Sequence, residues 1–456
     1  MAQPSPSSSL RRPDWLVQFG QRLLLARGRA GLTQLALASP DLSKSFISLL
    51  ESGRTFPSVE TVIALGQRLS SSVAGLLMDL PELRLETALN LVHLASHMDL
   101  TARGDEAVKL VAAAEALLPD MPIDLRIRAA LLRGRASIAA NQLEEAARWV
   151  DDAVAMARRQ RRPNRLGMAL ALKGEIEVRQ RTYQAAVPLL EDATTMMQRA
   201  KEARTEECVR ALVSLGTARW QLGQMTGARK AFARAGQLAA RLRLTALRGK
   251  ALTGLGMVEW MRRRLDSAVT YLTEAHDEMS QAEDVAEVSR VLSNLGLIRR
   301  EQGRLDDALS ALERALRIRE RLADPRARSA TLDEIAQVQL EMGRHADASR
   351  SARRALKEAQ AGRDRMREAE AQMTLGRVMS AQGRSQEATP LLRSALSTFK
   401  RLGLKSRTGV ASAELGLMPV DAGAQTEGAR YLRQGSRRSR GSKARSVDRA
   451  AQRLQR

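Results

Sequence analysis

The stretch EQGRLDDALSALERALRIRE, residues 301–320, carries two alanines seven residues apart, Ala308 and Ala315. The same pair recurs along most of the chain at intervals close to 40 residues. Its first members are Ala107, Ala146, Ala186, Ala228, Ala268, Ala308, Ala348 and Ala388. Twelve residues before each of them stands another small residue, namely Ala95, Gly134, Gly174, Gly216, Gly256, Gly296, Ala336 and Gly376. Repetition at a fixed period indicates an array of similar structural units.

Small side chains at these positions allow two antiparallel helices to approach closely, because a larger side chain at either place would clash. A turn is expected between them, marked by Gly223, Gly303, Gly343, Gly383 or, in the second repeat, Asn141. Arg181 and Arg263 occupy the same position in two other repeats, which predicts less tight turns there. Each unit is therefore expected to be a helical hairpin. Its apolar face is covered only by a neighbouring hairpin, so the sequence predicts a stacked α-solenoid.

This spacing resembles the tetratricopeptide repeat, in which helical hairpins repeat at shorter intervals. A leucine also recurs near the start of the first helices, at Leu212, Leu252, Leu292 and Leu332. The resemblance implies a right-handed α-solenoid of about eight hairpins over residues 85–404. Pro419 falls where the first helix of a ninth hairpin would continue, and a proline breaks a helix interior. We therefore expect a partial capping helix at residues 405–417.

The composition agrees with an all-α protein. Aromatic residues make up 3% of the 456 residues, and the abundant Ala, Leu, Arg, Glu and Gln favour helices. The formal net charge of +23 suits nucleic acid or acidic partners. Much of this excess lies in a basic tail, residues 418–456, whose Gly and Ser content is too high to bury a core. We expect this tail and the arm at residues 1–14 to be disordered.

No feature of the sequence points to catalysis, a cofactor or a membrane. It contains no Gly-rich phosphate loop, Cys208 is its only cysteine, and no apolar run suits a signal peptide or a bilayer span. His93 and His97 lie four residues apart, but the HLASH stretch lacks the glutamate of a metalloprotease motif, so packing histidines are the simpler explanation. We expect a cytoplasmic protein that is not an enzyme and has no cofactor or metal.

Residues 15–80 follow a different rhythm from the repeats and predict four to five short helices. Thr33 and Ser43 stand where helix N-caps are expected, and a third helix is predicted to run to Glu51. Gly31 and Gly53 mark the ends of the first and third helices. The pattern, which includes LSKSFISLLESGR at residues 42–54, resembles the helix-turn-helix domain of the Cro and lambda-repressor, or xenobiotic-response-element, class.

That resemblance implies binding to double-stranded DNA, with the N-terminal end of the third helix in the major groove. Lys44, Ser45 and Ser48 would then face base edges. Gln34 and Ser43 would position the domain on phosphates, and Arg27 and Arg54 would supply counter-charge to the backbone. Ile47 and Glu51 are assigned to structure. The alternative is an ordinary four-helix module that happens to have a capped third helix.

In the solenoid, basic and aromatic residues recur at equivalent positions of the first helices. They are Arg128, Arg210, Lys250 and Arg290 at one position, Trp220 and Trp260 at another, and Asn294 one turn after Arg290. In peptide-clamping members of the repeat family, the positions of Arg290 and Asn294 bind carboxylates. The resemblance thus implies a groove for a peptide or protein segment that is acidic or has a free C-terminus. Alternatively, the basic residues are coincidental and the tryptophans pack between repeats.

A helix-turn-helix domain joined to such a solenoid resembles the peptide-responsive transcription regulators of Gram-positive bacteria. The likeness implies a homodimer on a palindromic operator, with a peptide or protein ligand modulating DNA binding. Two other readings stay open. The chain could be an interaction scaffold with only weak DNA attachment, or the basic tail could bind nucleic acid without sequence preference.

Overall fold

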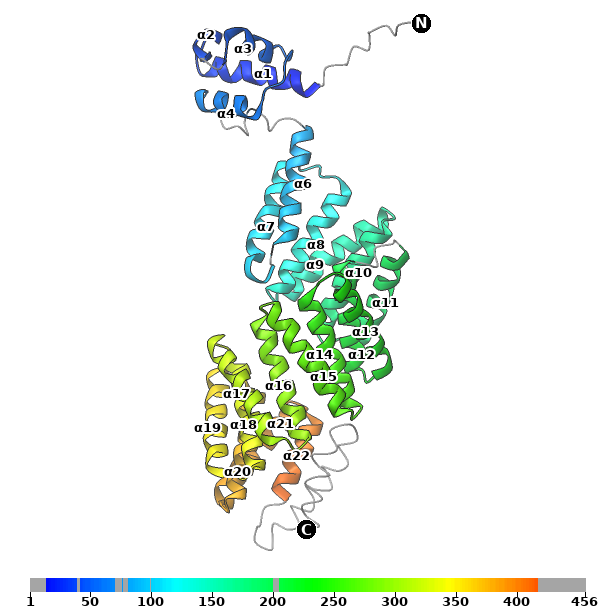
Figure 1. The fold of residues 1–456 in the computed structure, drawn as a ribbon, viewed down its shortest axis with the longest axis vertical. Helices are drawn as coiled ribbons and strands as arrows, with labels where there is room; N and C mark the ends of the chain where they lie inside the picture. The colour runs from blue at the N-terminus through cyan, green and yellow to red at the C-terminus, as the bar shows by residue number, and fades with distance from the viewer. Residues whose placement is uncertain are drawn as a thin grey trace. The chain divides into compact units, whose positions relative to one another are not determined.

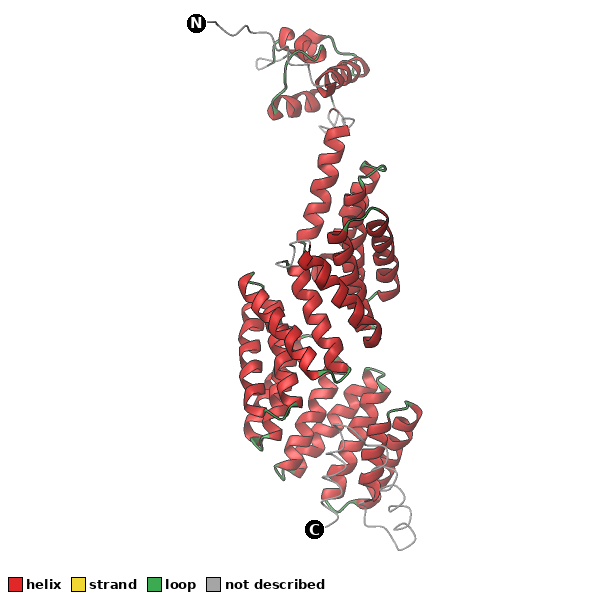
Figure 2. Cartoon of the chain, turned by 90° about the vertical axis from the view of Figure 1, so that its right-hand side faces the viewer, coloured by secondary structure: helices red, strands yellow, loops and turns green. Residues whose placement is uncertain are grey.

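The computed structural model describes residues 14–38, 42–69, 76, 81–98, 100–199 and 205–416. In these ranges the chain is all-helical (Figure 2). None of the helices found there is long and apolar enough to cross a bilayer. The predicted arm at residues 1–14 lies outside the described residues except for Asp14, which begins a helix, and the predicted tail at 418–456 also lies outside them. The chain divides into two compact units, Met1–Ile176 and Glu177–Arg456.

The first unit begins with four short helices, which we call the head. They are α1 (Asp14–Arg29), α2 (Gln34–Leu37), α3 (Lys44–Glu51) and α4 (Val59–Arg68). They share one core, which consists of Phe19, Leu23, Leu37, Leu42, Ile47, Leu50, Val62, Leu65, Leu69 and Leu76. The expected caps are present: the Thr33 and Ser43 hydroxyls accept hydrogen bonds from the amides of Ala36 and Phe46, both at 3.1 Å.

Glycine brings α3 against α1. A Cβ atom at Gly20 would lie 2.4 Å from the carbonyl oxygen of Glu51 and 2.5 Å from that of Leu50, so the two backbones are in direct contact. Gly53 has a φ of +61°, and the amides of Gly53 and Arg54 donate to the carbonyls of Leu50 and Leu49. This Schellman turn ends α3 as the sequence predicts.

Longer helices follow in antiparallel pairs, most of them 17 residues long (Figure 1). The rest of the first unit contains α6 (Pro81–His97), α7 (Leu100–Leu117), α8 (Ile123–Ala139) and α9 (Leu143–Arg159), and α10 (Pro163–Arg179) crosses into the second. The second unit contains α11 (Tyr183–Arg199), α12 (Glu206–Gln221), α13 (Met225–Arg241), α14 (Thr245–Met261), α15 (Leu265–Gln281) and α16 (Val285–Glu301). It continues through α17 (Leu305–Arg321), α18 (Pro325–Glu341), α19 (His345–Ala361), α20 (Arg365–Ala381), α21 (Ser385–Arg401) and α22 (Lys405–Gly416).

The small residues of the repeat lie where helices meet, as the sequence predicts. All eight first alanines are buried, and so are the small residues twelve positions earlier. A Cβ atom at Gly296 on α16 would lie 2.7 Å from the Leu312 side chain on α17, and one at Gly256 on α14 would lie 2.8 Å from Leu272 on α15. The glycine therefore sets the spacing of the two helices in these hairpins.

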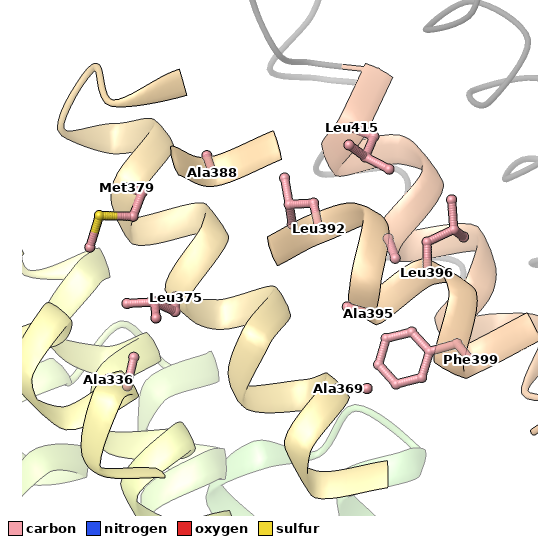
Figure 3. Packing of buried hydrophobic residues seen from close by; sticks show 12 residues of the cluster. Ala336, Ala369, Leu375, Met379, Ala388, Leu392, Ala395, Leu396, Phe399 and Leu415 are labelled. Atoms are coloured by element: carbon pink, nitrogen blue, oxygen red, sulfur yellow. The ribbon is translucent and has the colours of Figure 1, made fainter. Parts of the chain in front are cut away.

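Within each unit, buried side chains form hydrophobic cores between neighbouring helices. At the end of the second unit, Leu375 and Met379 of α20 pack with Leu392 and Phe399 of α21, and Leu415 of α22 belongs to the same cluster (Figure 3). The helix α22 lies where the capping helix is expected. Its apolar residues complete the core of the last hairpin.

The turns within hairpins are equally tight whether glycine or another residue occupies the turn position. The expectation of less tight turns at Arg181 and Arg263 is therefore wrong. Their φ angles are +66° and +65°, in the same left-handed region as Gly303 at +78°. The backbone hydrogen bonds also match: the amide of Arg181 donates to Val178 at 3.1 Å, and that of Gly303 to Arg300 at 3.0 Å. Packing of the two helices therefore imposes the left-handed backbone conformation, although a residue with a side chain disfavours it.

The left-handed conformation at these turns lowers the stability of the folded chain, and substitutions to and from glycine should show by how much. A left-handed residue other than glycine costs about 1–2 kcal/mol, part of which glycine's greater freedom in the unfolded chain offsets. We expect Arg181→Gly to raise the free energy of unfolding by up to about 1 kcal/mol. Gly303→Arg, at a turn with open space around the missing Cβ, should lower it by about 1 kcal/mol. Urea titrations of the two variants check both signs, and a loss of stability in Arg181→Gly would contradict the argument.

Candidate functional site

The third helix of the head presents a polar surface. Ile47 and Leu50 are fully buried in the head core, whereas Lys44, Ser45 and Ser48 are exposed. Ser43 is also exposed, and its hydroxyl caps the helix by accepting from the Phe46 amide. The structure therefore places the predicted base-facing residues on one exposed side of α3. The first turn is narrow because its exposed residues are two serines and one flexible lysine.

Arg27 and Gln34 have partners inside the head. The Nε and Nη2 atoms of Arg27 lie 2.5 and 3.2 Å from the Glu51 carboxylate, and Gln34 Nε2 donates to Glu51 Oε2 at 2.7 Å. Arg27 Nη1 also donates to the carbonyl of Leu32 at 2.8 Å. The hydrogen bond to Glu51 raises the pKa of Arg27 and keeps it charged.

Glu51 thus joins α1, α2 and α3, and its side chain is only 5% exposed. A structural role was predicted for Glu51 from the sequence, but its partners Arg27 and Gln34 were not. Arg27 and Gln34 hold the helices together here, and their contact with phosphates stays a prediction. Arg54 is exposed directly after the glycine that ends α3, at the opposite end of that helix from Lys44.

In the second unit, two of the three predicted ligand-binding cations have acidic partners on their own helices. Arg210 Nε lies 2.8 Å from Glu206 Oε1, and Arg290 is ion-paired with Glu287. Lys250 is half-buried. The charges of Arg210 and Arg290 are therefore already partly neutralised, which weakens the expectation of an acidic ligand.

The two tryptophans are half-buried and pack against the core shared by α13 to α16. Trp220 Nε1 is covered and has no hydrogen-bond acceptor among the described residues. Asn294 is half-buried on α16. The packing alternative thus accounts for much of the tryptophan surface, and ligand contact by Trp220, Trp260 and Asn294 stays a prediction.

A polar network that the sequence analysis missed lies on the first helices of the last repeats. Arg300 of α16 donates to Gln337 Oε1 at 2.8 Å and to Glu341 Oε1 at 2.7 Å, both on α18. Gln337 Nε2 in turn donates to Asp333 Oδ2 at 2.8 Å. The sequence held a signal for part of this network, because Asp333, Gln337 and Glu341 follow one another at intervals of four residues and so fall on one side of a helix.

The remaining candidates for chemistry have little support. His93 and His97 contact each other edge to face, with ring centroids 4.5 Å apart. Among the described residues no three His, Cys, Asp or Glu side chains are grouped so as to hold a metal ion. Cys208 is buried, and burial raises the pKa of its thiol, which disfavours the reactive thiolate.

Sequence comparison agrees with the hairpin geometry. Family models described as tetratricopeptide repeat match residues 171–241 and the overlapping ranges 287–361 and 328–401. These segments are tetratricopeptide repeats. The matched residues all lie in the helical array after the head. No curated protein matches the sequence.

Solved structures with a similar fold share low sequence identity. The apo form of the quorum sensor NprR from B. thuringiensis aligns at a TM-score of 0.63 and 14% identity, over 78% of this chain and 98% of that one. The apo form of RapI aligns at 0.59 and 14%, over 82% and 97%. A Rap protein complexed with the Competence and Sporulation Factor aligns at 0.50 and 14%, over 78% and 99%. Such likeness establishes the fold, an all-helical tetratricopeptide solenoid.

Proposed function

We infer that this chain is a sequence-specific DNA-binding regulator of transcription whose solenoid binds a peptide or protein segment that modulates DNA binding. The observation that carries the DNA-binding part is the surface of α3: a capped helix with Lys44, Ser45 and Ser48 exposed and its opposite side fixed in the head core. An α-helix fits the major groove, and short polar side chains near its N-terminus reach base edges.

The binding of a peptide by the solenoid is supported by likeness of fold. One Rap structure with a similar fold was solved in complex with the Competence and Sporulation Factor. Stacked hairpins present an extended row of first helices, which suits an extended segment of chain. A homodimer on a palindromic operator and a cytoplasmic location complete the proposal.

Removing the Lys44 side chain tests the DNA-binding part. Wild-type protein should enrich a preferred site from random oligonucleotides. We expect Lys44→Ala to lower the ratio of specific to non-specific affinity about tenfold, because a good base contact contributes roughly 1–3 kcal/mol. Fluorescence anisotropy with the selected site and a scrambled duplex measures this ratio.

Lys230→Ala is the matched control, because Lys230 is an exposed lysine on α13 of the solenoid. It removes the same charge and should leave the ratio unchanged. Failure of the wild-type chain to enrich any site would reject the proposal in favour of the scaffold. Exposed leucines in the head support that alternative, because they offer an apolar surface for a protein contact. Leu35 is 69% and Leu49 is 41% exposed.

A further inference from the structure

Asp333 and Glu334, two adjacent acidic residues on α18, form no ion pair within the described part of the chain, although ion pairs surround them. The described residues place no basic nitrogen within 4 Å of Asp333 or Glu334, although four guanidinium groups act on their charge. These groups are Arg300 of α16, Arg319 of α17, and Arg367 and Arg377 of α20, while the Glu370 carboxylate of α20 raises the pKa of Asp333. The pair therefore lies among cations without being paired to any of them.

Each of those cations is engaged elsewhere. Arg367 Nη1 lies 2.7 Å from Glu370, which Arg407 also contacts, and Arg377 Nε lies 3.0 Å from Glu414. Arg300 binds residues of α18 other than this pair, at Gln337 and Glu341.

Arg319 is directed to neutral acceptors. Its Nε lies 3.3 Å from the Ser289 hydroxyl, and its Nη1 contacts the carbonyl of Ala327 at 3.2 Å and the hydroxyl of Thr331. These contacts hold the guanidinium away from Glu334, leaving that carboxylate without a hydrogen-bonding cation.

The unsatisfied acceptor is a specific atom. Oε2 of Glu334 is covered from solvent and makes no hydrogen bond with the described residues. Asp333 has donors within the protein: Gln337 Nε2 donates to its Oδ2, and hydrogen bonding by the hydroxyl of the fully buried Thr374 on α20 lowers the pKa of its carboxyl, against the larger effect of burial. A buried acceptor left without a donor is costly, so Glu334 calls for a donor from outside.

We propose that the solenoid binds its peptide ligand through a basic side chain whose ammonium or guanidinium group donates to the Glu334 carboxylate, next to Asp333. This deepens the proposed peptide-binding function and rests on it. It also reverses the charge expected from Arg210, Lys250 and Arg290, two of which are already ion-paired. The covered Nε atom of Arg367, which lacks a hydrogen-bond acceptor among the described residues, suits a backbone carbonyl of the same segment.

Ligand binding should depend on pH, because burial and the Asp333 charge raise the pKa of Glu334 to about 7, against the opposing effects of Arg319, Arg367 and Arg300. The carboxyl is therefore partly protonated near neutrality. A cation binds the ionised form and displaces that proton. Affinity should consequently rise between pH 6 and pH 8 for a basic ligand and stay flat for a neutral one.

The test uses the full chain and four pools of fluorescein-labelled, C-terminally amidated heptapeptides. The pools are identical mixtures of neutral residues except at the central position, which is Arg, Lys, Gln or Glu. At pH 8 we expect the Arg or Lys pool to bind about tenfold more tightly than the Gln pool, as charge-assisted hydrogen bonds predict. Asp333→Asn combined with Glu334→Gln should abolish this preference while leaving Gln-pool binding intact.

Glu274→Gln combined with Glu313→Gln is the matched control, because both carboxylates are exposed on second helices and the change in net charge is the same. It should keep the preference. Equal binding of all pools, or a preference that survives in the Asp333 and Glu334 variant, would overturn the inference while leaving peptide binding in place. Absence of binding by every pool would reject peptide binding itself. Displacement of the Arg pool by micromolar spermidine would identify a small polyamine as the ligand and refute the peptide assignment.

Discussion

Gly20→Ala should destabilise the head by about 3 kcal/mol, the upper end of what overpacking costs. The new methyl group would stand 2.4 and 2.5 Å from two carbonyl oxygens at the end of α3. Backbone cannot rotate out of the way as a side chain can, so α3 must shift from α1. That shift would separate Arg27 from Glu51 and displace Lys44 from its place in the head. Hydrogen exchange of amides in residues 14–69 measures the loss, and amides of the solenoid should not change.

The same helix supplies the control. Gly28 lies on α1 with no atom within 4 Å of the position of its missing Cβ. Gly28→Ala should therefore stabilise the head by roughly 0.5–1 kcal/mol, because alanine restricts the unfolded chain more than glycine does. Equal effects at the two positions would mean that α1 and α3 do not pack as described.

The repeat was predictable because close helix packing leaves a direct trace in the sequence. A helix pair that approaches to the distance seen at Gly296 and Leu312 tolerates only a small residue at the contact. A small residue recurs at this position in all eight repeats, so the sequence alone predicts the hairpins and their order. The caps at Thr33 and Ser43 were predictable for a similar reason, since each depends on a residue and an amide three positions later.

The left-handed turns between hairpins could not be predicted from the sequence in this way. Arg161, Arg243, Glu283, Ala323 and Arg363 adopt positive φ angles from +50° to +56° without being glycine or asparagine. Tertiary packing imposes this conformation, and the local sequence does not favour it. The same failure explains the wrong expectation of looser turns at Arg181 and Arg263.

The candidate sites were predicted only as far as their residues share a helix. Lys44, Ser45 and Ser48 lie on one α-helical side, so their common exposure follows from the periodicity. Glu51 meets Arg27 across 24 positions of sequence, and Arg300 meets Gln337 across 37. Such pairings depend on how helices pack, which a single sequence does not specify. The ion pairs of Arg210 and Arg290 were missed in the same way, because the acids that pair with them were not considered.

Glu334→Gln should raise the free energy of unfolding by about 1–3 kcal/mol at pH 8 and leave it nearly unchanged at pH 4.5. The pKa of Glu334 is about 7 in the folded chain, above its ordinary value of 4.5, so the folded state holds a proton that the unfolded state has released. Wild-type stability therefore falls as pH rises from 4.5 through 7, and the full penalty is present above 7. Glutamine cannot ionise and removes this dependence. Asp333, whose pKa burial also raises, would contribute a residual slope.

Urea titrations of the second unit's helical signal at pH 4.5, 6, 7 and 8 measure this difference in the full chain. Glu313→Gln, at an exposed position on the neighbouring helix α17, should show no pH-dependent change relative to the wild type. If Glu334→Gln instead shifted stability equally at every pH, the carboxyl would be ionised throughout and paired with a cation such as Arg319. The Glu334 carboxylate would then be satisfied from within, and the basis for a cationic ligand at Asp333 and Glu334 would be lost.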